Sequence, residues 1–480
     1  MLDRRSTHAA FPRMPRAAAA AVVLLALVGA ACGNSGSTKA SSPSTAASGK
    51  TSGDPTTETT VVPGPHDTVG VTASSVTFTV IGSFTGSLSS VNGGFDKGLE
   101  AYFEMVNDAG GVNGRQLKVA AVRDDASDAG RANEQYQQAL GSDKPFAIAG
   151  DTGFLSYASE AATEGIPLVG LYGTEEWDKS DTFMAVGGSW KAADPEHLPP
   201  SPPGQTVGPA AYLVRKLGQD KIGVFGYNIA ASVNAAKSTC DNVQQLGVQC
   251  SFSDTTLSFG FTDIGSSLAK LQSTGTKVVY AAMDQGGCIT ILRSMRRAGI
   301  NDGAVYCATG NDKTIAGIPD LASGYFTFSG SPPATASDPV RDAFKSEIAK
   351  RKPGLDPLSG AVLSGWETGM MVTDALKQLG KNVTRSGFIN LIRTDPRWSK
   401  WDAHGLLPST VDFTHNHWTQ LADPKYQAPS ACGGYLLRGD PKTKTLQQVG
   451  QKPTLCVAGL KNAAGLDALV KSDTTTLDTP

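Results

Sequence analysis

The chain has 480 residues, of which 40% are hydrophobic and 18% charged, and 42 Lys and Arg against 44 Asp and Glu give a net charge of -2. This balance excludes the strongly basic surfaces that bind nucleic acid. About 400 residues follow the N-terminal segments, too many for one ordinary core and suited to two α/β lobes.

Residues 1–32 are typical of a bacterial export signal. Four arginines precede an apolar run over residues 17–31, which is too short for a good membrane-spanning helix. The run ends Val-Gly-Ala-Ala-Cys-Gly, which is similar to a lipobox and makes Cys32 the predicted lipidation site. Gly29 stands where Leu is usual, so an ordinary secretory signal with a chance cysteine is the alternative.

Residues 33–70 consist mainly of Ser, Thr, Gly, Ala and Pro. Such a segment buries too little apolar surface to offset the chain entropy lost on folding. We therefore expect a disordered tether between the signal and the folded part.

The folded part opens with a strand–helix–strand pattern over residues 76–125. Val76–Ile81 is β-branched and apolar, as a buried parallel strand requires, and Gly82 permits a turn at its end. Apolar side chains then recur on one helical face, at Phe95, Leu99, Tyr102, Phe103 and Val106. Residues 117–122 are the second strand, and Asp124-Asp125 at its end favours loop hydrogen bonding over a paired-carboxylate catalytic site.

Strands and helices continue to alternate along the chain. Strands are predicted over residues 146–149, 166–169, 221–225, 277–282, 304–307 and 324–328. Helices are predicted over residues 155–164, 207–217, 233–246, 339–350 and 359–379, and another carries Phe261, Ile264, Leu268 and Leu271. Proline-rich chain near residues 194–204 and 331–333 predicts crossings between two lobes. Past Trp398 the alternation breaks down, and no element is predicted there.

The residue identities in 76–125 point to one protein family more specifically than the strand–helix–strand pattern does. A strand followed by Ser-Phe-Thr-Gly, a helix ending Val-Asn-Asp-Ala-Gly-Gly-Val-Asn-Gly-Arg, and a strand ending Arg-Asp-Asp resemble the periplasmic-binding-protein type I family. The nearest branch is the leucine/isoleucine/valine-binding type, the solute receptors of ABC importers. The resemblance continues more weakly over residues 72–366.

The resemblance implies two doubly wound parallel-sheet lobes joined by a multi-crossover hinge. Residues 71–200 and 331–410 are then the first lobe, residues 201–330 and 411–470 the second, and residues 471–480 a tail. In this family a ligand binds between the lobes at the strand ends, and hinge closure buries it.

Candidate ligand residues follow from the family's site. Polar loops after two first-lobe strands hold the ligand's carboxylate, and a second-lobe aromatic and an acid hold its α-ammonium. The usual second-lobe Glu is absent here, so either Asp284 replaces it or the ligand is not an amino acid. Asp151 or Thr152 stands where the family usually has a Ser, and an aspartate there would repel a carboxylate. The candidates are Phe84, Asp151, Thr152, Gly153, Tyr172, Gly173, Thr174, Tyr227, Asp284, Gln285, Gly310 and Asn311. The competing interpretation is that the loop residues cap helices and the tyrosines pack.

Six cysteines fall in the folded part, an even number that indicates disulfides in an exported protein. Six cysteines allow fifteen pairings, and the predicted elements favour sequential ones among Cys240, Cys250, Cys288, Cys307, Cys432 and Cys456. A metal site is the alternative, but no cysteine pair has C-x-x-C spacing. His404, His415 and His417 could suggest zinc, but the His-x-His pair of His415 and His417 has no nearby third ligand of clear type.

The resemblance implies a binding protein, with no catalytic residues and no cofactor. We expect a monomer, lipid-anchored on the outer face of the cytoplasmic membrane, that delivers a small polar ligand to ABC transporter permease subunits. The alternative is a sensing module that signals to a membrane receptor without transport.

Overall fold

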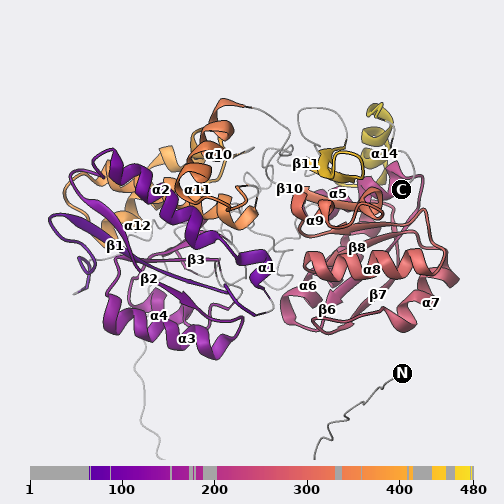
Figure 1. Ribbon diagram of the computed structural model, residues 1–480, viewed down its shortest axis with the longest axis horizontal. Coiled ribbons are helices and arrows are strands. Elements are labelled where there is room, and N and C mark those ends of the chain that lie inside the picture. Colours follow the sequence, from indigo (N-terminus) through magenta and orange to yellow (C-terminus); the bar gives the residue numbers. More distant parts are fainter. Residues whose placement is uncertain are drawn as a thin grey trace, which may run out of the picture. The chain divides into compact units, whose positions relative to one another are not determined.

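The computed structural model describes residues 64, 66–86, 88–151, 154–171, 177, 180–186, 203–329, 338–357, 359–407, 410–414, 435–449, 460–475 and 477. They form two α/β lobes, each built on one sheet (Figure 1). The first lobe contains residues 66–186 and 338–414, and the second contains residues 203–329 and 435–477. The three connections, residues 187–202, 330–337 and 415–434, lie outside the described residues.

The first sheet has five parallel strands in the order β2-β1-β3-β4-β5. They are β1 (Ser75–Gly82), β2 (Gln116–Asp124), β3 (Ala147–Asp151), β4 (Leu168–Leu171) and β5 (Phe183–Val186). Seven of the eight residues of β1 are buried, which confirms the strand predicted from its apolar run. The strand β5 was not predicted from the sequence.

Helices from two distant parts of the chain complete the first lobe. They are α1 (Ser89–Asn92), α2 (Phe95–Asp108), α3 (Ala129–Gln138), α4 (Ala158–Thr163), α10 (Pro339–Arg351), α11 (Gly360–Leu379) and α12 (Arg385–Thr394). Aspartates begin two of them: Asp128 accepts a hydrogen bond from Arg131 N, and Asp338 accepts one from Arg341 N. Each bond satisfies an amide that would otherwise lack a partner in the first helical turn.

The late helix α11 packs directly on α2 (Figure 1). Glycines make this contact possible: a Cβ at Gly365 would lie 2.0 Å from Phe95 O, and one at Gly98 would lie 2.0 Å from Val362 O. The resemblance implied that residues past 338 return to the first lobe, and α11 packs on α2 there.

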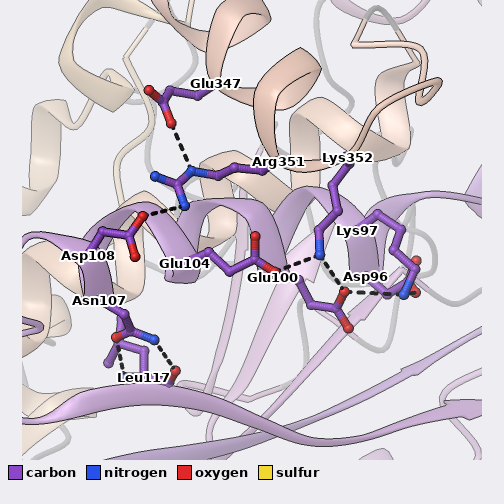
Figure 2. A network of polar contacts seen from close by, with 10 residues as sticks. All are labelled: Asp96, Lys97, Glu100, Glu104, Asn107, Asp108, Leu117, Glu347, Arg351 and Lys352. Carbon is purple, nitrogen blue, oxygen red and sulfur yellow. Dashed lines mark hydrogen bonds and ion pairs between the residues drawn. The ribbon is translucent and has the colours of Figure 1, made fainter.

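Charged side chains also join α2 to the end of α10 (Figure 2). Lys352 Nζ lies 3.1 Å from Glu100 Oε2 and 2.7 Å from Glu104 Oε1, and Arg351 Nη1 lies 2.8 Å from Asp108 Oδ2. In each pair at least one partner remains partly exposed, from 23% for Glu100 to 69% for Asp108, so solvent screens the attraction and each pair contributes about 1 kcal/mol at most.

Two arginines of α12, the buried Arg385 and the half-buried Arg393, bind backbone carbonyls of other first-lobe segments. Arg385 donates to Pro145 O at 2.6 Å and to Phe146 O at 3.0 Å. Arg393 donates to the carbonyls of Asp181, Phe183 and Phe413 at 2.8, 2.6 and 2.7 Å. Burial lowers the pKa of Arg393 to about 10, so it remains charged at neutral pH.

Residues 66–70, expected in the tether, belong to the folded first lobe. The Asp67 carboxylate accepts hydrogen bonds from Ser386 N at 2.7 Å and Ser386 Oγ at 2.8 Å, and Asp67 O accepts one from Arg385 N at 2.8 Å. The expected tether boundary at residue 70 therefore overlaps the folded lobe, because Asp67 binds the start of α12.

The second sheet has seven strands in the order β12-β11-β10-β9-β8-β6-β7. They are β6 (Lys221–Tyr227), β7 (Gln249–Leu257), β8 (Val278–Ala282), β9 (Ala304–Cys307), β10 (Tyr325–Ser329), β11 (Tyr435–Asp440) and β12 (Thr445–Gln448). The strands from β6 to β10 are parallel, whereas β11 and β12 are antiparallel additions at one edge.

The second-lobe helices are α5 (Pro203–Lys216), α6 (Ala230–Gln245), α7 (Gly265–Thr274), α8 (Gln285–Arg297), α9 (Asp312–Ala316) and α14 (Ala463–Ser472). The prediction that Phe261 belongs to a helix was wrong. The helix α7 begins only at Gly265, and the preceding Asp263 carboxylate accepts a hydrogen bond from Gly265 N.

The chain past Trp398, where no element was predicted, divides between the lobes. Trp398 and Trp401 pack with Phe413 in the first lobe, so the expected lobe boundary at residue 410 falls within a first-lobe segment. Residues 435–477 add β11, β12 and α14 to the second lobe. There Asp473 accepts a hydrogen bond from the Tyr212 hydroxyl of α5.

Candidate functional site

The loop after β1 is held by the two aspartates at the end of β2. Asp124 Oδ1 accepts hydrogen bonds from Phe84 N at 3.0 Å and Thr85 N at 3.1 Å. Asp125, which is fully buried, accepts one from Ser83 Oγ at 2.6 Å. Partial burial would raise the pKa of the Asp124 carboxyl, but its hydrogen bonds with Thr85 and neighbouring amides lower it. The predicted loop hydrogen bonding is confirmed for this pair.

The first-lobe candidates leave the sheet from three neighbouring strands. Gly82 ends β1, Asp151 ends β3, and the two residues are paired in register. Leu171 ends β4, which pairs with β3. Parallel strands place their carboxyl ends at one edge, so these loops emerge together. Phe84 is half-buried against the first-lobe core.

Several first-lobe candidates cannot be placed further. The side chain of Asp151 and the residues Thr152, Gly153, Tyr172, Gly173 and Thr174 lie outside the described residues. Their contribution to a site remains a prediction.

The second-lobe candidates follow β6, β8 and β9, which are also neighbours. Tyr227 is the last residue of β6, Asp284 and Gln285 follow β8, and Gly310 and Asn311 follow β9. The structure therefore brings all five to the carboxyl edge of one sheet.

Tyr227 is packed rather than presented at that edge. Its side chain is 4% exposed, and its ring centroid lies 4.1 Å from that of Phe259. Its hydroxyl donates to Asp284 Oδ1 at 2.6 Å. Burial, then the hydrogen bond and charge of Asp284, raise the pKa of Tyr227, so it remains a donor at neutral pH.

Two other second-lobe candidates cap helices. Asp284 accepts a hydrogen bond from Gly287 N at 3.0 Å at the start of α8. Asn311 accepts one from Thr314 N at 2.8 Å at the start of α9. The competing interpretation of loop residues as helix caps is thus correct for both.

The remaining two second-lobe candidates have structural contacts of their own. The Gln285 amide oxygen accepts a hydrogen bond from the Thr314 hydroxyl. A Cβ at Gly310 would lie 2.9 Å from the Thr327 methyl group, so packing accounts for this glycine. Both contacts fix the loops that leave β8 and β9.

Thr309, on the loop between β9 and α9, was not among the candidate ligand residues. Its hydroxyl is buried and has no hydrogen-bond partner among the described residues. The loop is anchored there by Tyr325, whose hydroxyl donates to Thr309 O at 2.5 Å. In the sequence, the only indication that Thr309 could belong to the site was its position next to the candidate Gly310.

Two of the predicted disulfides are present. Cys240 is bonded to Cys250 and Cys288 to Cys307, with Cα–Cα distances of 5.1 and 5.9 Å. Sequential pairing is therefore confirmed for these four cysteines. Cys432, Cys456 and the predicted lipidation site Cys32 lie outside the described residues.

Other features of the described residues suggest no second site. No group of His, Cys, Asp and Glu within them could hold a metal ion, and His404 lies 2.9 Å from Asp374. None of their helices combines the length and apolar character needed to cross a membrane. A shallow depression of about 520 Å³ lies at the opposite, amino edge of the first sheet. There Arg115 donates to Thr72 O and Lys381 O at 2.7 and 3.0 Å.

Known proteins share this architecture. An amino acid binding protein of Pseudomonas aeruginosa is 24% identical over 267 residues, which cover 54% of this chain and 68% of that protein. The fatty acid ABC transporter substrate-binding protein from Thermomonospora curvata has a TM-score of 0.62 at 19% identity, covering 85% of this chain and 96% of that one. The branched-chain amino acid transporter substrate binding protein LivJ from Streptococcus pneumoniae, in complex with isoleucine, has a TM-score of 0.60 at 17% identity, covering 78% and 99%.

The family model for periplasmic binding proteins matches residues 75–420, well over half of the chain. The matched region begins at β1 and includes both lobes up to the third connection. The strand order and the return of α10 and α11 agree with the type I fold expected from residues 76–125. The chain belongs to the periplasmic binding protein family, a family of solute-binding proteins. Its fold is similar to that of leucine- and branched-chain amino acid-binding proteins, as the resemblance implied.

Proposed function

We propose that this chain is an extracytoplasmic solute-binding protein that captures a small polar ligand, an amino acid or a related carboxylate or amide, between its lobes. The main support is that the predicted ligand loops of each lobe leave neighbouring strands at the carboxyl edge of its sheet. Open α/β sheets bind ligands at that edge. Hinge closure would then present the loaded protein to an ABC importer.

The second-lobe contacts bear on which ligand group is recognised. An α-ammonium needs a carboxylate acceptor, yet Asp284 already receives the Tyr227 hydroxyl and the Gly287 amide. Asn311 is uncharged and caps α9. These contacts favour a ligand recognised through a carboxylate or amide over one held by its ammonium. The fatty acid transporter protein of similar fold and the amino acid binding relative represent the two classes.

A matched pair of ligands tests this choice. L-Leucine and 4-methylpentanoate have the same carbon chain and carboxylate and differ only in the ammonium group. We expect 4-methylpentanoate to bind at least as tightly, measured by titration calorimetry and by melting temperature. At 100 times its Kd, a true ligand should add about 2.7 kcal/mol of stability. Binding of L-leucine alone would refute the preference, and 4-methylpentanamide separates carboxylate from amide recognition.

We further propose that Cys32 carries a lipid anchor on the outer face of the cytoplasmic membrane. Replacing Cys32 by Ser should then release the protein into the soluble fraction, as fractionation and immunoblotting would show. Retention of the Cys32→Ser variant in the membrane would contradict the anchor.

Delivery to an importer is tested in cells. Deleting the protein should abolish uptake of a radiolabelled ligand that the purified protein binds. Unchanged uptake would instead favour ligand sensing without transport, which is the alternative function.

A further inference from the structure

Two loops at the carboxyl edge of the second sheet are linked to each other by a disulfide at their base and by side-chain hydrogen bonds. The first, residues 283–287, comprises the connection from β8 to α8 and the first three residues of α8. The second, residues 308–312, comprises the connection from β9 to α9 and the first residue of α9. Both contain candidate ligand residues, and both end in a capped helix.

A disulfide joins the chain segments that hold the two loops. Cys288 lies in the first turn of α8, and Cys307 is the last residue of β9. Both side chains are fully buried, and their Cα atoms are 5.9 Å apart.

Side-chain hydrogen bonds also join the two loops. The Thr314 hydroxyl of α9 is within hydrogen-bond distance of Gln285 Oε1 in the first loop, and lies 2.9 Å from Asn311 Oδ1 in the second. The Tyr227 hydroxyl fixes Asp284 from β6. The loops therefore have little freedom to separate while the disulfide is intact.

We propose that the Cys288–Cys307 disulfide is a positioning element of the binding site, which holds the β8 and β9 loops at a fixed separation before ligand arrives. A preorganised site loses less conformational freedom on binding, so it binds more tightly. This inference rests on the proposed function, because it assigns the disulfide to the same site.

The second disulfide provides a matched control in the same lobe. Cys250 lies at the start of β7 and pairs in register with Ile222 at the start of β6, so Cys240–Cys250 is at the amino edge of the sheet. Removing it deletes a disulfide from this sheet without touching either loop.

The test compares C288A/C307A with C240A/C250A in the exported full chain. Hydrogen–deuterium exchange should become at least tenfold faster in residues 284–291 and 308–316 of C288A/C307A, and stay within twofold of wild type there in C240A/C250A. Unchanged exchange in C288A/C307A, or equal acceleration in both variants, would overturn the proposal. If C288A/C307A does not fold, Thr314→Val keeps the disulfide and should accelerate exchange in both loops by less, about twofold.

Binding of L-leucine and 4-methylpentanoate supplies the second readout. Whichever binds wild type should bind C288A/C307A at least fivefold more weakly and C240A/C250A within twofold of wild type. Equal affinities in the two variants would refute positioning. If neither compound binds wild type, the proposed ligand class fails, while the exchange measurement still decides whether the disulfide positions the loops.

Discussion

The two lobes share an architecture but are held together by different means. The second lobe carries disulfides that join residues 10 and 19 positions apart, so each constrains a local part of the chain. The first lobe contains no cysteine and is assembled from segments more than 150 residues apart, namely residues 66–186 and 338–414. Its long-range assembly depends on Arg385, Arg393 and the glycine contact of α11 with α2.

The two observed disulfides therefore do not stabilise the contacts between the segments that are farthest apart in sequence. In the chain-entropy view a disulfide stabilises more when it closes a longer loop, yet both observed disulfides close short ones. In the first lobe, hydrogen bonds and close packing join residues 66–186 to residues 338–414. The substitutions with the largest effects on stability should therefore lie there.

Replacing Arg393 should cause the largest loss. Arg393→Ala leaves three backbone carbonyls without their donor and creates a cavity. We expect the free energy of unfolding to fall by about 3–5 kcal/mol, measured by urea denaturation. Arg397→Ala is the control, because that side chain is 66% exposed and binds only the nearby Asp395 among described residues. A loss no greater than that of the control would show that the carbonyl contacts do not hold the first lobe.

Adding one methyl group between α2 and α11 should have the next largest effect. In Gly365→Ala the new Cβ would meet Phe95 O at 2.0 Å, a backbone atom that cannot move aside without shifting a helix. Stability should fall by roughly 3 kcal/mol in chemical denaturation, despite the better helix propensity of alanine.

Gly360→Ala is the matched control on the same helix. A Cβ there would meet nothing within 4 Å. This variant should be unchanged or slightly more stable, by about 0.5 kcal/mol. Equal losses in the two variants would mean that the close approach of α2 and α11 is not the cause.

A buried acid of α11 should make first-lobe stability depend on pH. Burial raises the pKa of Glu367 from 4.5 to about 8, and Arg341 only partly opposes this. Between these values the folded protein holds a proton that the unfolded chain has released, so stability falls as pH rises from about 5 to 8.

The variant Glu367→Gln should remove this slope. At pH 8 we expect it to exceed wild type by roughly 2 kcal/mol, with a smaller gain at pH 5, measured by urea denaturation at both pH values. Glu134→Gln, at an exposed position of α3, serves as the control. A gain that does not change with pH would contradict a buried protonated carboxyl.

The smallest effect should come from the surface ion pairs between α2 and α10. Lys352→Ala removes contacts with Glu100 and Glu104, whose side chains are 23% and 46% exposed. We expect a loss of about 0.5 kcal/mol that disappears in 1 M NaCl. Lys350→Ala, which pairs only within α10 among described residues, should show less, and a salt-independent loss would indicate packing instead.

Strands with continuous apolar runs could be predicted from sequence, and β9 was predicted to the residue. The strand β5 was not predicted although its apolar run is as long as that of β9, and β11 carries Arg438 within it. An edge strand such as β11 is defined by its distant partner β10 rather than by its own composition.

The candidate site shows the same limit. Strand ends located the second-lobe candidates correctly at one sheet edge. Whether Asp284 meets a ligand or the protein depends on Tyr227, which lies 57 positions earlier in sequence and reaches it only through the fold. Local sequence cannot report such a contact.

The bonds between Asp67 and the start of α12 have a mechanical consequence. Asp67 precedes β1, and its carboxylate and carbonyl bind Ser386 and Arg385. A pulling force applied to the chain on the N-terminal side of Asp67 would therefore act on these three hydrogen bonds before it acted on β1. The hydrogen bonds of Asp67 would transmit this force to α12, and β1 would bear it only after they had broken.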